Sequence, residues 1–285
     1  MKLLRVGPSG AERPAAVDGA GRLVDLTGVV EDITGTVLAP PELARIRAAL
    51  DAGDLPALDA EGLRIGPPLA HPGKIICIGL NYRDHAAETG ATLPTEPVMF
   101  LKAPDTVIGP YDDVLVPRKS VKTDWEVELA VVIGTRARYL DTHAEALACV
   151  AGYAVVNDVS EREFQLERAG QWDKGKNCET FNPLGPWLVT ADEIADPQNL
   201  GLRLWVNGAK RQDGNTANMA FGVAEIVRYL SHFVVLYPGD VINTGTPAGV
   251  ALGQADPKPY LRAGDVVELE IDGLGRARQQ FVAAT

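Results

Sequence analysis

The stretch from Thr123 to Gly134 constrains the fold more than any other part of the chain, because it has the pattern of a buried strand. Residues 125–133 are rich in Val and Leu and end at a glycine, which predicts a β-strand. Side chains alternate between the two faces of a strand, so one face carries an unbroken apolar set. That set comprises Trp125, Val127, Leu129, Val131 and Ile133. We therefore expect this face to cover a hydrophobic core.

The other face of the same strand places two carboxylates close together. Glu126 and Glu128 are followed by Ala130 and Val132, so this face becomes apolar again after the second acid. Two residues apart on a strand, the carboxylates are about 6–7 Å apart at Cα and point the same way. Burying even one unpaired carboxylate costs several kcal/mol, and like charges add repulsion. If the face is covered, a divalent cation is the usual means of stabilising such a pair.

A second apolar run supplies a third carboxylate. Residues 150–158 predict a second strand, an apolar run that ends abruptly in the carboxylate of Asp158. Three carboxylates with no nearby Cys or His favour a hard cation, so Mg²⁺ or Mn²⁺ fits better than Zn²⁺, and Ca²⁺ is a third candidate. From these residues alone an alternative stays open. The two glutamates could lie on the wet face of an edge strand, with Asp158 merely beginning a turn.

Length, charge and cysteine content narrow the class of protein. At 285 residues the chain can bury a sizeable core. The net charge is −11 and no Lys/Arg run occurs, so we expect neither nucleic acids nor anionic membranes as partners. The N-terminal apolar stretch is too short for a signal peptide, and no segment approaches the roughly 20 apolar residues of a membrane span. Three widely spaced cysteines without a C-x-x-C pair predict a cytoplasmic protein.

The chain divides into a small leading unit and a larger one. Residues 1–70 predict short strands joined by Gly- and Pro-rich turns, with a helix over 41–50, and carry no evident chemistry. The proline-rich segment 67–72 is the expected boundary. We therefore predict a small N-terminal domain over 1–70 and a larger domain over 71–285 that holds the candidate site. Within the larger domain, residues 221–232 predict an amphipathic helix.

A short helical segment near the start of the larger unit carries a candidate acid–base pair. His85 and Glu88 are three residues apart and so share one helical face. A carboxylate beside an imidazole fixes its tautomer and raises its basicity, as a general base requires. A solvated surface His–Glu pair is the alternative interpretation. Lys102 stands at the end of an apolar strand. Its side chain also has two possible interpretations, a solvated group at the rim of a site or a clamp for an anion.

A long polar stretch between predicted strands is a further candidate for function. Residues 170–185 show little hydrophobic period and interleave Trp172 and Phe181 with Lys174 and Lys176. Long polar loops are functional more often than most segments.

Motifs of several other enzyme classes are missing. The sequence has neither G-x-x-x-x-G-K-[ST] nor G-x-G-x-x-G for nucleotide phosphates, and no G-x-S-x-G for a serine hydrolase.

Together these segments resemble the fumarylacetoacetate hydrolase family, in an order of motifs that is highly specific. The resemblance covers residues 72–285, and the stretch 170–176 looks like the branch of diketo sugar-acid hydrolases and ureidoglycolate lyases. The matching pieces are Gly79-Leu-Asn-Tyr-Arg-Asp-His85-Ala-Ala-Glu88, Phe100-Leu-Lys102, Trp125-Glu-Val-Glu-Leu-Ala-Val-Val-Ile-Gly134, Gly152-Tyr-Ala-Val-Val-Asn-Asp158-Val-Ser-Glu-Arg162, Gly175-Lys176 and Asn243-Thr-Gly-Thr-Pro-Ala-Gly249.

The resemblance implies an α+β, mostly β fold. This is a mixed β-sandwich roll around the metal, with a small N-terminal α/β unit, usually in a homodimer. Glu126, Glu128 and Asp158 fall on the family's metal ligands, and His85 and Glu88 on its water-activating pair. Lys102 and Lys176 fall on the family's contacts to substrate and transition state. Three further residues fall on positions that line the pocket: Arg162, Gln165 and Thr246.

The implied activity is hydrolysis of a C–C bond in a small 2,4-dioxo acid, either an acylpyruvate or a diketo-deoxy sugar acid, with release of pyruvate. His85, oriented by Glu88, would deprotonate the attacking water, and Lys176 would stabilise the oxyanion. Relatives also run decarboxylation, isomerisation, hydration, dehydration and C–N lysis, as in ureidoglycolate lyase, on a metal-held 2-oxo acid. These reactions are the alternative, and a non-catalytic 2-oxo acid binder is a further one. Glu179 and the stretch 103–106 depart from the family pattern near the expected pocket, which leaves the substrate open.

Overall fold

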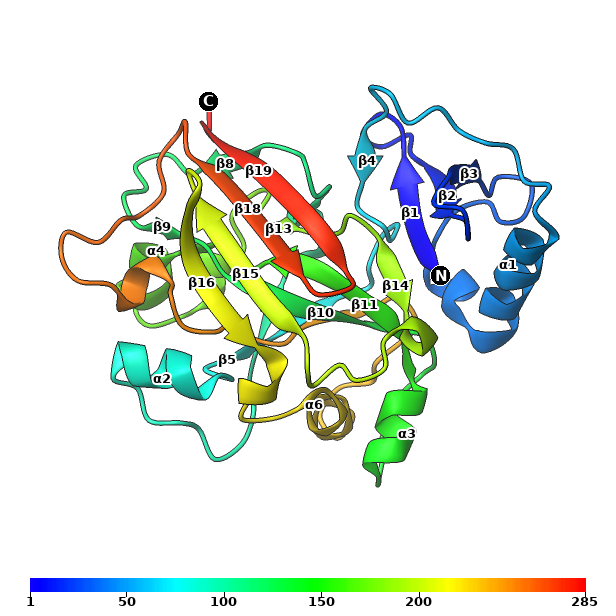
Figure 1. Cartoon of the computed structure of the whole chain (residues 1–285). Coiled ribbons are helices and arrows are strands. Elements are labelled where there is room, and N and C mark those ends of the chain that lie inside the picture. Colours follow the sequence, from blue (N-terminus) through cyan, green and yellow to red (C-terminus); the bar gives the residue numbers. More distant parts are fainter.

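Two β-sheets form the framework of the molecule, and the computed structural model describes all residues 1–285 (Figure 1). The larger sheet has ten strands, nine of them in the order β3-β2-β1-β14-β11-β10-β17-β5-β6, and β4 pairs with β1. Strand β17 runs parallel to β5 and the other neighbours are antiparallel, so the sheet is mixed. Its strands are β1 Lys2–Val6, β2 Arg13–Val17, β3 Leu23–Asp25, β4 Ile65–Gly66, β5 Ile75–Gly79, β6 Val98–Lys102, β10 Val127–Ile133, β11 Val150–Asn157, β14 Leu188–Thr190 and β17 Val241–Asn243.

The second sheet has five strands in the order β16-β15-β18-β19-β8. They are β8 Val114–Val116, β15 Gly201–Val206, β16 Ala209–Asn215, β18 Val266–Ile271 and β19 Gly275–Ala283. Asn207 and Gly208 connect β15 to β16 with positive φ angles of 50° and 78°, as the predicted two-residue hairpin turn requires. Two short ribbons complete the strands: β9 Thr123–Asp124 with β12 Ser160–Glu161, and β7 Val107–Ile108 with β13 Asn182–Pro183.

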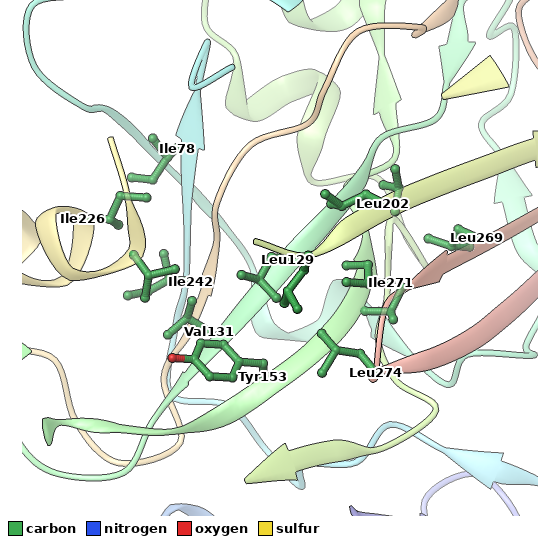
Figure 2. Packing of buried hydrophobic residues seen from close by; sticks show 14 of the residues in the cluster. Ile78, Leu129, Val131, Tyr153, Leu202, Ile226, Ile242, Leu269, Ile271 and Leu274 are labelled. Atoms are coloured by element: carbon green, nitrogen blue, oxygen red, sulfur yellow. The ribbon is translucent and has the colours of Figure 1, made fainter. Parts of the chain in front are cut away.

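The main hydrophobic core lies between the two sheets. Figure 2 shows Leu129 and Val131 of β10 and Tyr153 of β11 packed with Leu202 of β15 and Ile271 of β18. The apolar set predicted on one face of residues 125–133 belongs entirely to this core. Burial of each large aliphatic or aromatic side chain contributes about 1.5–3 kcal/mol, so this face of β10 is firmly held in place.

The predicted strand over 125–133 begins two residues later than expected, at Val127. The reason lies in the hydrogen bonds of the preceding residue. The backbone N–H of Glu126 donates to the side-chain Oδ1 of Asn157 at 3.0 Å, instead of to a backbone carbonyl. The backbone carbonyl of Glu126 accepts from the N–H of Asp158 at 2.9 Å. Glu126 therefore sits in a break between β9 and β10, directly beside the end of β11.

The N-terminal residues extend the larger sheet. Strand β1 pairs with β14, so the sheet crosses the boundary expected at residue 70. A second hydrophobic cluster also crosses it, because Leu3 and Ile46 pack with Ala130 and Val132 on the face of β10 opposite the main core. The helix predicted over 41–50 is α1, Pro40–Ala52. The leading unit forms a lobe at one end of the sheet (Figure 1).

The remaining helices are short. They are α2 Arg83–Thr89, α3 His143–Ala148, α4 Arg162–Leu166, α5 Asp173–Lys176 and α6 Val223–Leu230, together with the 3-10 turns η1 Gly35–Leu38, η2 Pro104–Thr106, η3 Ala191–Glu193, η4 Thr216–Asn218 and η5 Ala251–Gly253. Ile226 of α6 points toward Ile242 of β17 (Figure 2), so this helix covers one edge of the main core. None of the helices combines the length and the apolar character that crossing a membrane requires.

Candidate active site and metal centre

The structure brings the three predicted carboxylates together in the interior. Strand β10 lies between β11 and β17, so the interpretation of an edge strand with a wet face is wrong. Glu126, Glu128 and Asp158 are only 5%, 2% and 1% exposed. One carboxylate oxygen from each lies within 4.8 Å of the others. The pairing of β10 with β11, in register at Val127 and Asn157, places Asp158 beside the two glutamates.

Three buried cations compensate part of this negative charge: Lys102, which pairs with Asp158, and the two that contact Glu126, Lys176 and Arg162. The Nζ of Lys176 donates to Oε2 of Glu126 at 2.7 Å and to Oδ2 of Asp158 at 2.8 Å. The Nη2 of Arg162 donates to Oε1 of Glu126 at 2.7 Å. Burial by itself would raise the pKa of Glu126, but the charges of Lys176 and Arg162 outweigh it and lower this pKa to about 2. Burial would lower the pKa of Lys176 and of Arg162, but Asp158 and Glu126 raise the pKa of the lysine. Asp124 and Glu126 raise that of the arginine, so both side chains stay protonated.

Glu128 is the carboxylate with least compensation. Its Oε2 accepts the backbone N–H of Gly245 at 2.7 Å, and no basic side chain forms an ion pair with it. Burial, together with repulsion from Asp158 and Glu126, raises the pKa of Glu128 well above its usual range. A positive φ of 94° and a clash of any Cβ with Asn81 explain why glycine occupies position 245.

The donor set at this cluster fits a hard divalent cation. It offers carboxylate oxygens only, and the ion would relieve the repulsion that Glu128 experiences. The residues therefore fit Mg²⁺ or Mn²⁺.

The predicted pair of His85 and Glu88 lies at the same site, on α2. His85 is 7% exposed, so the alternative of a solvated surface pair is wrong. The Nδ1 of His85 lies 2.8 Å from Oε1 of Glu88, and Oε2 of Glu88 accepts the backbone N–H of Gly249 at 2.8 Å. A carboxylate beside Nδ1 favours the tautomer with the proton on Nδ1, which leaves Nε2 as the basic nitrogen.

These groups line one pocket with a volume of about 210 Å³. Eight of the predicted site residues are among its 18 lining residues: His85, Glu126, Glu128, Asp158, Arg162, Gln165, Lys176 and Thr246. Arg162 is held in place by Oδ2 of Asp124 at 2.9 Å and donates to Oε1 of Gln165 at 3.0 Å. Glu88 lies behind His85, outside the lining.

The structure does not bring Lys102 to the pocket wall. Its side chain is fully buried and its Nζ donates to Asp158, to the carbonyl of Phe181 at 2.7 Å and to the carbonyl of Val159 at 3.2 Å. All three N–H groups of the ammonium are therefore used within the protein. Neither interpretation, a rim group or an anion clamp, matches this geometry, because β6 directs the side chain into the protein behind Asp158. The departures from the family pattern, Glu179 and residues 103–106, are also absent from the pocket lining.

Sequence reasoning missed Asp124. This carboxylate is completely buried and accepts the Nε–H of Arg162, the backbone N–H of Ala251 at 2.8 Å and that of Leu252 at 3.0 Å. It therefore joins the loop after β17 to the guanidinium that holds Glu126. The signal that could have found it is a third acid directly before the predicted strand that carries the two glutamates. The apolar pocket wall was also missed: Ile78, Leu80, Ala91, Phe100, Leu166 and Leu252.

Comparisons with known proteins show the family of the chain. The family model for the fumarylacetoacetate (FAA) hydrolase C-terminal domain matches residues 74–282. A relative from Burkholderia cenocepacia (strain HI2424), whose provisional name is hydrolase, is 55% identical over 280 residues, which are 98% of each chain.

Two solved structures superpose over 100% of both chains. One, from Mycobacterium abscessus, is named as a probable 2-hydroxyhepta-2,4-diene-1,7-dioate isomerase and has 32% identity and a TM-score of 0.83. The other is maleylpyruvate hydrolase from Sphingobium sp. SYK-6 in complex with a manganese(II) ion and pyruvate, with 28% identity and a TM-score of 0.82. The predicted resemblance and the mostly β fold with mixed sheets are thus confirmed, and the chain belongs to the fumarylacetoacetate hydrolase family.

Proposed function

We propose that the protein is a metal-dependent hydrolase that cleaves a C–C bond of a small 2,4-dioxo acid and releases pyruvate. The observation that carries the proposal is the pairing of two kinds of group in one pocket. A buried imidazole, held through Nδ1 by Glu88, shares this pocket with three carboxylates suited to a divalent cation. The first group can activate water, and the second can hold a chelating 2-oxo acid.

Glu126, Glu128 and Asp158 would hold Mg²⁺ or Mn²⁺, and the bound ion would supply Lewis-acid stabilisation of negative charge on the 2-oxo acid. His85 takes a proton from water at Nε2, while Glu88 stabilises the resulting imidazolium through Nδ1. Hydroxide adds to the C4 carbonyl of the substrate. The C3–C4 bond then breaks, C4 leaves as a carboxylic acid, and the electron pair passes to the enolate of pyruvate. Protonation of this enolate at C3 completes the reaction.

Lys176 is suited to stabilise the oxyanion. Two of its three N–H groups are held by Glu126 and Asp158, which fixes the ammonium at the charged end of the pocket. The third N–H forms no hydrogen bond within the protein and is available to an oxygen of the substrate. A donor fixed before the reaction stabilises developing charge without the cost of reorganisation.

An isomerase acting on a 2-oxo acid is the second candidate, because the structural relative from M. abscessus carries that name at 32% identity. In that reaction His85 would move a proton between carbon atoms and no water would be consumed. The two candidates therefore differ in whether solvent oxygen enters the product.

A substrate screen with Mg²⁺ or Mn²⁺ tests the proposal. Acylpyruvates, diketo-deoxy sugar acids, oxaloacetate and ureidoglycolate are incubated with the protein, and pyruvate is measured by a coupled dehydrogenase. We expect pyruvate from a 2,4-dioxo acid, with one atom of ¹⁸O from labelled water in the other product. Substrate that rearranges with no pyruvate and no label would replace the hydrolase by the isomerase.

We also propose that the protein is a homodimer. Strand β6 forms the free edge of the larger sheet and exposes Met99 and Leu101 to 39% and 46%, which supports an apolar contact there. Light scattering at micromolar concentration tests the assembly. A stable monomer would refute it.

A further inference from the structure

We propose that the outer part of the pocket binds an apolar tail, so that the preferred substrate is a 2,4-dioxo acid with an alkyl or aryl acyl group. Substrates whose tail carries a second carboxylate or several hydroxyls would be disfavoured. This inference rests on the proposed function and names the substrate class of the same site. It differs from the hydroxylated sugar acid suggested by the resemblance of residues 170–176.

The pocket wall changes from charged to aromatic along a short path. The Nζ of Lys176, at the carboxylate cluster, lies 5.2 Å from the ring centroid of Phe100. The Phe100 ring in turn meets Trp172 edge to face, with centroids 5.7 Å apart and an interplanar angle of 72°. The indole rests against Gly79, where an added Cβ would lie only 2.3 Å from its Cζ3. Glycine at position 79 thus makes room for the aromatic wall.

The hydroxyl groups of the wall are already engaged, whereas the amide N–H₂ of Gln165 has no partner within the protein. Thr246 donates its hydroxyl to the carbonyl of Val127 at 2.9 Å and accepts from Gln212 at 2.8 Å. Thr89 donates its hydroxyl to the carbonyl of His85 at 2.9 Å. Few hydrogen-bonding groups are therefore left to replace the water around a hydroxylated tail.

The two basic side chains of the wall are engaged in the same way. The guanidinium of Arg162 is held by Asp124, Glu126 and Gln165, and Lys176 lies between two carboxylates. The remaining N–H of Lys176 serves the reacting oxygen at the head of the substrate in the proposed function, so a second carboxylate on the tail would find no further cation in the wall. It would also lose its water, which is costly for an unpaired charge.

An apolar tail meets a wall of matching character. Beside the two aromatic rings, the lining includes Leu80, Ala91 and Leu252. Each methylene removed from water strengthens binding about fourfold. A tail of three carbons beyond C3 therefore gains at least about tenfold over one that carries a carboxylate or hydroxyls.

Binding of six-carbon 2-oxo acids to the Mg²⁺-loaded protein tests the inference without depending on turnover. Calorimetry compares 2-oxohexanoate, 2-oxohexanedioate and 4,5,6-trihydroxy-2-oxohexanoate, which share one chelating head. We expect 2-oxohexanoate to bind at least about tenfold more tightly than either polar analogue. Equal or tighter binding of a polar analogue, or binding of none of the three, would overturn the inference. Failure of the proposed function is seen separately, as the absence of pyruvate from any 2,4-dioxo acid.

Variants then locate the tail. Trp172→Ala should weaken binding of 2-oxohexanoate several-fold and leave binding of pyruvate, which has no tail, unchanged. Trp205→Ala is the matched control, because this indole lies on β15 and stacks on Arg276 outside the pocket. It should change neither affinity. A Trp172→Ala variant that loses affinity for pyruvate and 2-oxohexanoate equally would show that the indole does not contact the tail.

Discussion

Glu88 and Gly249 are joined by a hydrogen bond of 2.8 Å, in which the backbone N–H of the glycine donates to Oε2 of the carboxylate. The other oxygen of Glu88 holds the imidazole of His85. Gly249 belongs to the loop after β17, and the next residues of this loop, Ala251 and Leu252, donate to Asp124. One loop therefore contacts both the carboxylate that orients the candidate base and Asp124. Asp124 in turn holds Arg162 beside the carboxylate cluster.

Replacing His85 by alanine should reduce kcat on the best dioxo acid by about 10²–10⁴-fold, because general-base catalysis is typically of that size. KM should change far less, and metal affinity should survive. His143→Ala is the matched control, since this imidazole is exposed on α3 and pairs with Glu225 away from the pocket. Steady-state kinetics checks both variants. Nearly full activity of His85→Ala would show that water activation is not the chemistry.

Replacing Glu88 by glutamine should cost less than loss of the imidazole, with a fall in kcat of about 10–100-fold. The amide can still accept the N–H of Gly249, but it no longer holds a proton on Nδ1 by its charge. We expect the loss to appear in kcat rather than in KM, because the change affects the orientation of the imidazole and not the binding of substrate. Glu225→Gln alters the analogous surface pair and should leave kcat unchanged. A kcat of Glu88→Gln equal to that of the wild type would count against the orienting role.

Replacing Glu128 by glutamine should have opposite effects on metal binding and on the metal-free protein. Loss of the charge should weaken Mg²⁺ and Mn²⁺ binding, while the amide oxygen can still accept the N–H of Gly245. The metal-free protein should melt at a higher temperature, because repulsion from Asp158 and Glu126 is removed.

The measurement for Glu128→Gln is thermal unfolding with and without metal. The wild type should gain stability with metal, about 2.7 kcal/mol at a concentration of 100 Kd, and the variant should gain little. Glu268→Gln, on the second sheet, should behave as the wild type. A metal-dependent rise in Tm that is as large in Glu128→Gln as in the wild type would argue that the ion binds elsewhere.

Replacing Lys102 by methionine should destabilise the fold by about 3–5 kcal/mol, since it removes one partner of a buried ion pair. It also leaves the carbonyls of Phe181 and Val159 without this donor. Urea unfolding measures the change. Lys210→Met removes an exposed lysine that pairs with Asp213, and should cost at most about 1 kcal/mol. Unchanged stability together with a large rise in KM would instead place Lys102 in substrate binding.

Local patterns in the sequence were sufficient to predict the strands that carry the site. The alternation over residues 125–133 correctly separated the core-facing side chains from Glu126 and Glu128, because strand geometry fixes which residues share a face. The apolar run predicted over 150–158 corresponds to β11, which ends one residue earlier, at Asn157. The order of motifs was sufficient for the family. The spacing of His85 and Glu88 also predicted their contact, since residues three apart meet on a helix.

Only the tertiary structure decided which charged side chains are buried and where they point. From sequence alone Glu126 and Glu128 could lie on a wet edge, and it is the pairing of β10 with β11 and β17 that covers them. The burial of His85 beside the candidate pocket depends on the loop after β17, which follows Glu88 by more than 150 residues along the chain. Such contacts leave no local periodicity in the sequence.

Lys102 and Asp124 illustrate the same limit. The charge of each was visible, but whether a charged side chain points to solvent, substrate or an internal partner depends on what lies opposite it in space. Lys102 meets Asp158, and Asp124 meets Arg162, each from a distant part of the chain. Residue type and spacing determined which chemistry was available to this protein. The packing of distant segments decided which of its charges are free to act, because only a folded interior removes the competing water.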